Sequence, residues 1–267
     1  MTDLDEPGFE QLSRRILQVS GFATAAYKPR VLRRRIAVRM RANNVHTYEE
    51  YLAILDRMPE EYQKLADALT INVTKFFRNP ELWARLRELV IPELWKIPQR
   101  PIMVWSAGCS SGEEPYTLAM LFASTRGPLD RIRIDATDID RVCLERAQAG
   151  SYPQSSFSET PAEIVEAYTT PLAEQRQVIA SLRAIVSVNR LDLTRERPRN
   201  PPYDMIVCRN VLIYFDRLMQ ERLFTLFADS LRPGGFLVLG KVETIMGPTK
   251  ERLEMVDPRE RIYWRPI

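Results

Sequence analysis

The first 96 residues place apolar side chains at helical spacing. Leu32, Ile36 and Met40 recur every fourth position in a segment that begins at Pro29 and ends near Asn43. This spacing puts the three side chains on one face of an amphipathic helix. Comparable patterns predict further helices over 9–19, 48–58, 59–69 and 81–94. The N-terminal part of the chain is therefore predicted to be helical.

Short apolar runs replace this pattern after residue 98. They occupy 102–106, 132–136, 203–209 and 236–240, and helices are predicted at 114–125, 141–149 and 217–231. Because strands that alternate with helices form a mostly parallel sheet, this half is predicted to be α/β. We expect a boundary at Pro98, between residues 1–97 (helices plus a linker) and residues 98–267. Residues 150–190 are less regular, with a strand predicted over 182–188.

Residues 101–116 join the first predicted strand to a helix through small side chains. A strand, a small-residue turn and a helix in this order form a nucleotide-binding crevice at the carboxyl end of a parallel sheet. Only Gly108 and Gly112 are glycines, so neither the dinucleotide motif nor the phosphate-binding P-loop fits. Glu113 and Glu114 would repel a phosphate at this helix start. The loop suits a ligand with hydroxyls or positive charge, such as an adenosine that bears a sulfonium.

The same loop has two competing interpretations. Residues 108–112 satisfy G-x-S-x-G, the nucleophile elbow of α/β-hydrolases. That triad needs a His after the Ser, whereas the one histidine of the chain, His46, precedes it. We therefore reject a hydrolase. A tight turn without a ligand stays open on the loop alone.

Composition narrows the class of protein. Hydrophobic residues make up 45% of the 267 and charged residues 27%, as in ordinary soluble domains. The acidic N-terminus and the lack of a long apolar run predict a cytoplasmic protein with no membrane insertion. Three unpaired cysteines and one histidine make a metal site improbable, so none is expected.

A cluster of arginines follows the apolar face of the second predicted helix. Its members are Arg33, Arg34, Arg35, Arg39 and Arg41. A solvated surface is the simple interpretation, and docking of an acidic partner is equally compatible with a chain whose net charge is only +3. The segment lacks the interleaved aromatics of single-strand binders, so we expect no nucleic acid.

Polar side chains at two other places are candidates for the site. Asn72, Thr74 and Arg78 lie in a polar-aromatic segment that could also be a plain linker. Asp138 ends the second strand of the predicted sheet, where an acid accepts hydrogen bonds from ribose hydroxyls. An acid at this point can also be a turn or N-cap residue. We favour the ribose role because Asp138 ends the strand that comes next in the chain after the small-residue loop and its helix.

Four motifs resemble one family over nearly the whole chain. They are N-V-T-K-F-F-R at 72–78, W-S-A-G-C-S-S-G-E-E-P-Y at 105–116, A-T-D-I-D at 136–140 and C-R-N-V-L-I-Y-F-D at 208–216. These motifs resemble the CheR-type chemotaxis receptor glutamate methyltransferases. The resemblance implies a class I S-adenosylmethionine-dependent fold with an N-terminal all-α domain and a small inserted β subdomain at about 150–190. It also implies methyl transfer to glutamates on cytoplasmic chemoreceptor helices, which yields γ-methyl esters and S-adenosylhomocysteine.

The same resemblance implies roles for individual residues. Arg78 and Tyr214 would be catalytic, and the arginine cluster would face the receptor. Cofactor contacts would come from Asn72, Thr74, Arg78, Ala107, Gly108, Glu114, Asp138, Ile139, Asp192, Leu193, Arg209 and Asn210.

The chain departs from the family pattern at three places. Asp192 stands where the family typically has Asn, and residues 240–243 replace a typical G-x-S-E. No glycine lies between Gly150 and Gly234, so the loop that grips a receptor pentapeptide tether in some members is not expected. Two alternatives stay open: a class I methyltransferase of another substrate, and a non-catalytic module that senses the cofactor or scaffolds receptors. We expect a monomer.

Overall fold

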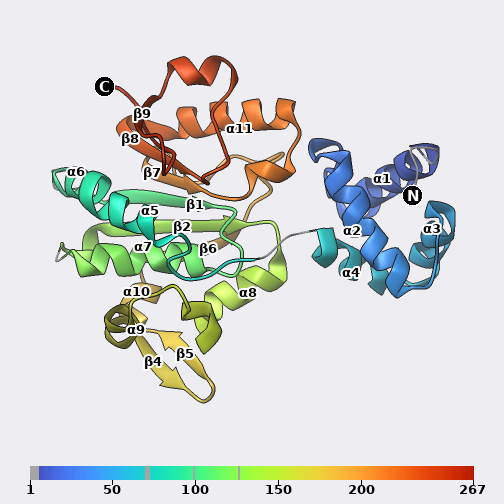
Figure 1. Cartoon of the computed structure of the whole chain (residues 1–267), viewed down its shortest axis with the longest axis horizontal. Coiled ribbons are helices and arrows are strands. Elements are labelled where there is room, and N and C mark those ends of the chain that lie inside the picture. The colour runs from blue at the N-terminus through green and yellow to red at the C-terminus, as the bar shows by residue number, and fades with distance from the viewer. Residues whose placement is uncertain (1–5, 70–72, 99, 126) are drawn as a thin grey trace. The chain divides into compact units, whose positions relative to one another are not determined.

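The computed structural model describes residues 6–69, 73–98, 100–125 and 127–267. Packing divides the chain into two units (Figure 1). The helical unit comprises residues 1–71 together with 214–220, and the sheet unit comprises residues 72–213 and 221–267.

The described residues of the helical unit contain four α-helices. They are α1 (Glu6–Ser20), α2 (Pro29–Ala42), α3 (Tyr48–Arg57) and α4 (Glu60–Leu69), with a 3-10 turn, η2 (Thr24–Ala26), after α1. Leu32, Ile36 and Met40 are buried, which confirms the predicted apolar face of α2. The segment 214–220 packs into this unit, because Tyr27 bridges to Phe215 with ring centroids 4.8 Å apart.

A seven-stranded sheet forms the centre of the sheet unit. Its order is β6-β2-β1-β7-β8-β10-β9. The strands are β1 (Ile102–Ala107), β2 (Ile132–Asp138), β6 (Val186–Arg190), β7 (Tyr203–Cys208), β8 (Leu231–Leu239), β9 (Glu254–Asp257) and β10 (Ile262–Trp264). The first five in this order pair in parallel, and β10 is antiparallel to both of its neighbours. The predicted α/β class with a mostly parallel sheet is confirmed.

Helices cover both faces of this sheet (Figure 1). On one face, α7 (Glu113–Ser124) packs with Val104 and Ile134 in the main core. On the other face, Phe227 of α11 (Arg217–Ser230) contacts Trp105 edge-on at 5.6 Å. The helix α8 (Arg141–Ala149) follows β2.

The helical stretch before β1 packs with the sheet unit. It consists of α5 (Pro80–Arg85), a π-helical turn η3 (Leu86–Val90) and α6 (Ile91–Trp95), and its apolar side chains join the main core. The sequence pattern places this stretch with the N-terminal helices, before the expected boundary at Pro98. In the structure, the change from one unit to the other falls between residues 71 and 72.

A small antiparallel sheet interrupts the α/β order. Its strands run in the order β3-β5-β4, and the insert also contains two helices and a 3-10 turn. These elements are β3 (Ser151–Pro153), η5 (Gln154–Phe157), α9 (Ala162–Tyr168), β4 (Thr169–Leu172), β5 (Gln175–Val178) and α10 (Ala180–Arg183). The predicted strand at 182–188 is wrong in its first half, because Leu182 lies in α10. Its second half belongs to β6 of the main sheet.

Three short 3-10 turns complete the connections. They are η4 (Leu129–Arg131), η6 (Leu212–Tyr214) and η7 (Gly247–Glu251). None of the helices in the described part of the chain is long and apolar enough to span a membrane.

Candidate active site

The loop between β1 and α7 turns on two glycines. Gly108 has φ +78° and Gly112 has φ +96°, a left-handed region that favours glycine. The amides of Gly108 and Cys109 donate to the carbonyl of Thr137 on the neighbouring strand, at 2.8 and 2.9 Å. A Cβ on Gly108 would lie 2.5 Å from Cγ2 of Val211. The loop therefore packs closely against the segment that follows β7.

Asp138 closes this loop at the end of β2. Its Oδ2 accepts from the amide of Ser110 at 2.8 Å, and its Oδ1 accepts from the amide of Asp140 at 3.0 Å. Burial raises the pKa of Asp138, and the two amides oppose that rise. Each oxygen has a further lone pair, so the carboxylate could also accept hydrogen bonds from ribose hydroxyls.

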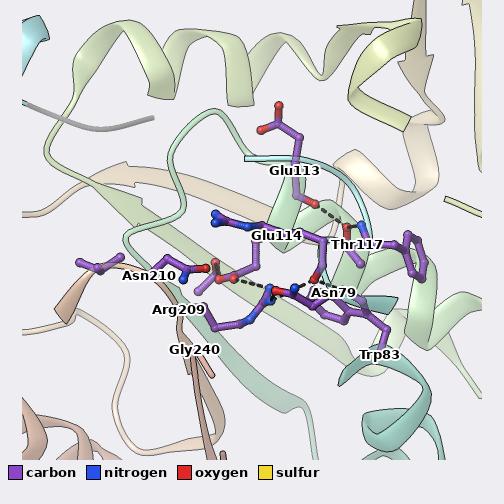
Figure 2. Close-up of polar contacts among 12 residues, drawn as sticks. Asn79, Trp83, Glu113, Glu114, Thr117, Arg209, Asn210 and Gly240 are labelled. Atoms are coloured by element: carbon purple, nitrogen blue, oxygen red, sulfur yellow. Dashed lines mark hydrogen bonds and ion pairs between the residues drawn. The ribbon is translucent and has the colours of Figure 1, made fainter. Parts of the chain in front are cut away.

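Glu114 and Arg209 form a buried ion pair beneath the loop (Figure 2). The side chain of Glu114 is 12% exposed and that of Arg209 only 4%, and Oε2 lies 3.5 Å from Nη1. Ser106 donates to the other oxygen of Glu114 at 2.8 Å. Burial raises the pKa of Glu114, while Arg209 and Ser106 oppose the rise. Burial likewise lowers the pKa of Arg209.

Arg209 also ties the segment before α5 to the end of β7. Its Nη2 donates to the carbonyl of Arg78 at 2.9 Å and to Oδ1 of Asn79 at 2.8 Å. Its guanidinium lies over the ring of Trp83, 5.3 Å from the centroid (Figure 2). The family motifs predict Arg209 beside the cofactor but do not indicate Asn79 and Trp83 as its partners. The one available signal, Asn79 before Pro80, also marks an ordinary helix start.

Arg78 and Thr74 lie in the segment that leads to α5, and both are half-buried. The Nη1 of Arg78 donates to the carbonyl of Val73 at 2.8 Å. The predicted contact Asn72 lies outside the described residues. Ile139 is half-buried just after Asp138. The cofactor roles of these residues stay predictions.

Asp192 uses its side chain within its own turn. Its Oδ1 accepts from the amide of Thr194 at 2.9 Å and from the hydroxyl of Thr194 at 2.6 Å. Its own amide donates to Oε2 of Glu196 at 2.6 Å. Asp192 is buried and Leu193 is half-buried. The structure thus gives the Asp that replaces the family's Asn a local partner for one oxygen.

Glu243 is a buried carboxylate to which the sequence motifs assign no role. Its Oε1 accepts from the amides of Val211 and Leu212 at 3.0 and 2.9 Å. Its Oε2 accepts from the amides of Gly240 and Asn210 at 2.6 and 3.1 Å. Only 4% of the residue is exposed. Burial raises the pKa of Glu243, and the four amides oppose the rise.

Ala107 is buried at the end of β1, and the remaining predicted residues belong to the helical unit. Tyr214 accepts at its carbonyl from the amide of Lys28 at 2.9 Å. Arg39 forms a two-pronged pair with Glu61 at 2.9 and 2.8 Å, and Arg33 pairs with Glu6. Two of the five arginines are therefore engaged within the unit. Arg34 and Arg41 are exposed, and Arg35 is half-buried.

The sheet-unit residues define what the site can bind. Asp138 at the end of β2 and Glu114 in the first turn of α7 are carboxylates that suit hydroxyls and a positively charged group. Within the described chain there is no group of three or more His, Cys, Asp or Glu that could hold a metal ion. A mostly parallel sheet, a glycine-hinged loop after β1 and an acid at the end of β2 together define a Rossmann-like nucleotide-cofactor enzyme.

Comparison with known proteins identifies the family. Residues 72–262 match the model of the CheR methyltransferase, SAM binding domain, and residues 7–70 match its all-alpha domain. The chain belongs to the CheR methyltransferase family. It is 33% identical to chemotaxis protein methyltransferase 2 of Pseudomonas aeruginosa over 89% of this chain and 86% of that protein. It is 32% identical to a chemotaxis protein methyltransferase of Listeria monocytogenes, over 91% and 92%.

Family membership confirms the predicted class of enzyme and its cofactor. The chain is an S-adenosylmethionine-dependent methyltransferase. The two carboxylates fit this cofactor, because Asp138 can accept further hydrogen bonds and Glu114 offers a negative charge beside the loop. The chain thus combines the class I methyltransferase fold with an all-α N-terminal domain, as predicted.

Proposed function

We propose that this protein methylates glutamate side chains on the cytoplasmic helices of methyl-accepting chemoreceptors, with γ-methyl esters and S-adenosylhomocysteine as products. The observation that carries the proposal is the loop 107–114, which ends in Glu114 and is bonded to Asp138, within a domain that matches the family model. Relatives named as chemotaxis protein methyltransferases support the choice of substrate.

The chemistry of the acceptor fits the residues present. A glutamate carboxylate is ionised at neutral pH, so its oxygen can attack without a general base. When bound, S-adenosylmethionine supplies a methyl group on a positively charged sulfur that leaves as a neutral thioether. The protein has to position the two partners and exclude water, which can contribute about 7–11 kcal/mol.

Individual side chains would divide this work. The loop at Gly108 would hold the cofactor, and Asp138 would accept from ribose hydroxyls. Glu114 would stabilise the positive charge nearby. Arg78 has guanidinium donors beyond the one bonded to Val73, and these would orient the substrate carboxylate. Tyr214 would shape the approach to the methyl group.

The exposed arginines of α2 would form the receptor-facing surface. Arg34 and Arg41 lie on the exposed side of the helix, whereas Arg33 and Arg39 have acidic partners inside the unit. Acidic receptor helices would therefore meet mainly the first pair. We further propose that the protein acts as a monomer without nucleic acid, and that it binds no pentapeptide tether.

The test is a transfer assay with labelled S-adenosylmethionine and receptor cytoplasmic fragments. We expect label on the receptor that alkali releases as methanol. Label that survives alkali, or label on RNA, would contradict glutamate esters. Cofactor binding with no transfer to any fragment would favour the non-catalytic module.

Two substitutions test the catalytic residues. Arg78→Ala and Tyr214→Phe should each lower turnover while the circular dichroism spectrum stays that of the wild type. Arg87→Ala is the matched control, because Arg87 is an exposed arginine that donates to the hydroxyl of Ser124 at 3.1 Å. Wild-type turnover in either variant would show that its role is misassigned. Binding of a receptor C-terminal pentapeptide in a calorimetric titration would refute the expectation of no tether.

A further inference from the structure

We propose that Glu243 is a positioning residue for the cofactor site. Its carboxylate fixes the backbone at 210–212, and that backbone in turn fixes the loop at Gly108. The inference rests on the proposed cofactor role of that loop, and it adds a residue from outside the loop and outside the strands next to it. Glu243 follows β8, three residues after Gly240.

The first step is the match between four donors and one carboxylate. An ionised carboxylate has two oxygens that act only as acceptors, and here each oxygen accepts from two amides. Three of these amides belong to consecutive residues, Asn210 to Leu212. A left-handed backbone at Asn210, φ +58°, lets consecutive amides point to one side. No neutral side chain of the same shape can accept all four bonds.

The second step is the close approach at Gly240. A Cβ on Gly240 would lie 2.7 Å from Oε2 of Glu243 and 3.0 Å from the amide nitrogen of Asn210. Figure 2 shows Gly240 beside Asn210. The glycine therefore leaves the room that the carboxylate needs to reach the 210–212 backbone.

The third step leads from this backbone to the cofactor loop. Val211, whose amide is held by Glu243, places Cγ2 where a Cβ on Gly108 would meet it at 2.5 Å. Val211 therefore limits how far the Gly108 turn can move toward β7. A shift of the 210–212 backbone would release that limit and loosen the loop.

Asp204 provides a matched control on β7, the strand that precedes the 210–212 backbone. It lies at the other end of β7 from Arg209 and is 2% exposed. It accepts from two guanidinium nitrogens of Arg100, at 2.8 and 2.6 Å, and from the amide of Met103 at 2.8 Å. Asp204→Asn thus weakens a buried carboxylate network away from the loop.

The experiment compares Glu243→Gln with Asp204→Asn in the full chain. Glutamine keeps the shape but offers one acceptor oxygen, and its NH2 group faces two amide donors. Titration with S-adenosylhomocysteine should show affinity weaker by about tenfold or more in Glu243→Gln. Asp204→Asn should lower the melting temperature yet bind like the wild type. In transfer assays, Glu243→Gln should raise KM for S-adenosylmethionine far more than it lowers kcat.

Each result decides a separate point. Equal affinity of folded Glu243→Gln and the wild type overturns the inference, and so does an equal loss in Asp204→Asn. No binding by the wild type overturns the cofactor site itself. If Glu243→Gln does not fold, Val211→Ala decides, because it removes the methyl groups that face the Gly108 turn. Weaker affinity in folded Val211→Ala supports the contact through Val211, and affinity equal to that of the wild type overturns it.

Discussion

Replacing Arg209 by methionine tests the buried network most directly. The substitution keeps an apolar stem of similar length but removes the charge from a side chain that is 4% exposed. It removes the hydrogen bonds to the Arg78 carbonyl and to Asn79, and it leaves Glu114 without its cation. Loss of one partner of a buried ion pair costs about 3–5 kcal/mol. For a unit of this size, that cost lowers the melting temperature by roughly 6–20 °C.

The loss of unfolding free energy in Arg209→Met should also depend on pH. Burial already raises the pKa of Glu114, and Arg209 opposes that rise. Without Arg209, the pKa of Glu114 should rise further. A carboxylate with a raised pKa stabilises the folded state in acid, and that stabilisation is lost as the pH rises through its folded-state pKa. The difference in unfolding free energy between Arg209→Met and the wild type should therefore be smaller at pH 5 than at pH 8.

Urea denaturation at both pH values measures this difference. Arg209→Met/Glu114→Gln should be less destabilised than the sum of the two single variants, by about 1–3 kcal/mol. Arg252→Met is the control, because Arg252 and Asp229 form an ion pair whose side chains are 39% and 43% exposed. That loss should stay below about 1 kcal/mol. An equally small loss for Arg209→Met, or additive costs, would refute the reasoning.

Three further predictions concern other charges. Glu61→Ala should cost about 3–5 kcal/mol in urea denaturation, because this carboxylate is 1% exposed in its pair with Arg39; a loss below about 1 kcal/mol would contradict the network. Affinity for S-adenosylmethionine should fall from pH 8 to pH 5, because protonation of Glu114 removes a negative charge that favours the cation. Glu114→Gln should bind more weakly and flatten that dependence, and an unchanged slope in calorimetry would exclude Glu114 as its source. Arg34→Glu/Arg41→Glu should raise KM for the receptor fragment but not for the cofactor, most strongly at low salt; an equal effect of Arg57→Glu, elsewhere on the surface, would show that only net charge matters.

The sequence predicted elements best where one local pattern determined them. Leu32, Ile36 and Met40 lie on the buried face of α2, and the apolar runs at 102–106 and 132–136 are strands. Both patterns reflect which side chains are buried. Burial of apolar surface is the main favourable contribution to folding, so its spacing indicates the local structure. The stretch 182–188 failed because a short apolar run is ambiguous, and here it divides between α10 and β6.

Site residues that act through distant partners could not be found in this way. Nothing near Glu243 in the sequence indicates that amides 32 and 31 residues upstream need an acceptor. Arg209 likewise finds Asn79 and Trp83 across a large part of the chain. The family resemblance located the motif residues, but it could not show that Arg39 is engaged with Glu61 while Arg34 is exposed. Such distinctions depend on tertiary packing.

The placement of residues 214–220 limits how this protein can be dissected. The motif at 208–216 begins in one unit and ends in the other, so Arg209 and Tyr214 have different packing partners although they belong to one short motif. A fragment that started at residue 72 would keep the sheet but would deprive Phe215 of Tyr27 and the Tyr214 carbonyl of its Lys28 donor. Chimaeras that exchange N-terminal helices between relatives should therefore transfer the 214–220 segment along with them.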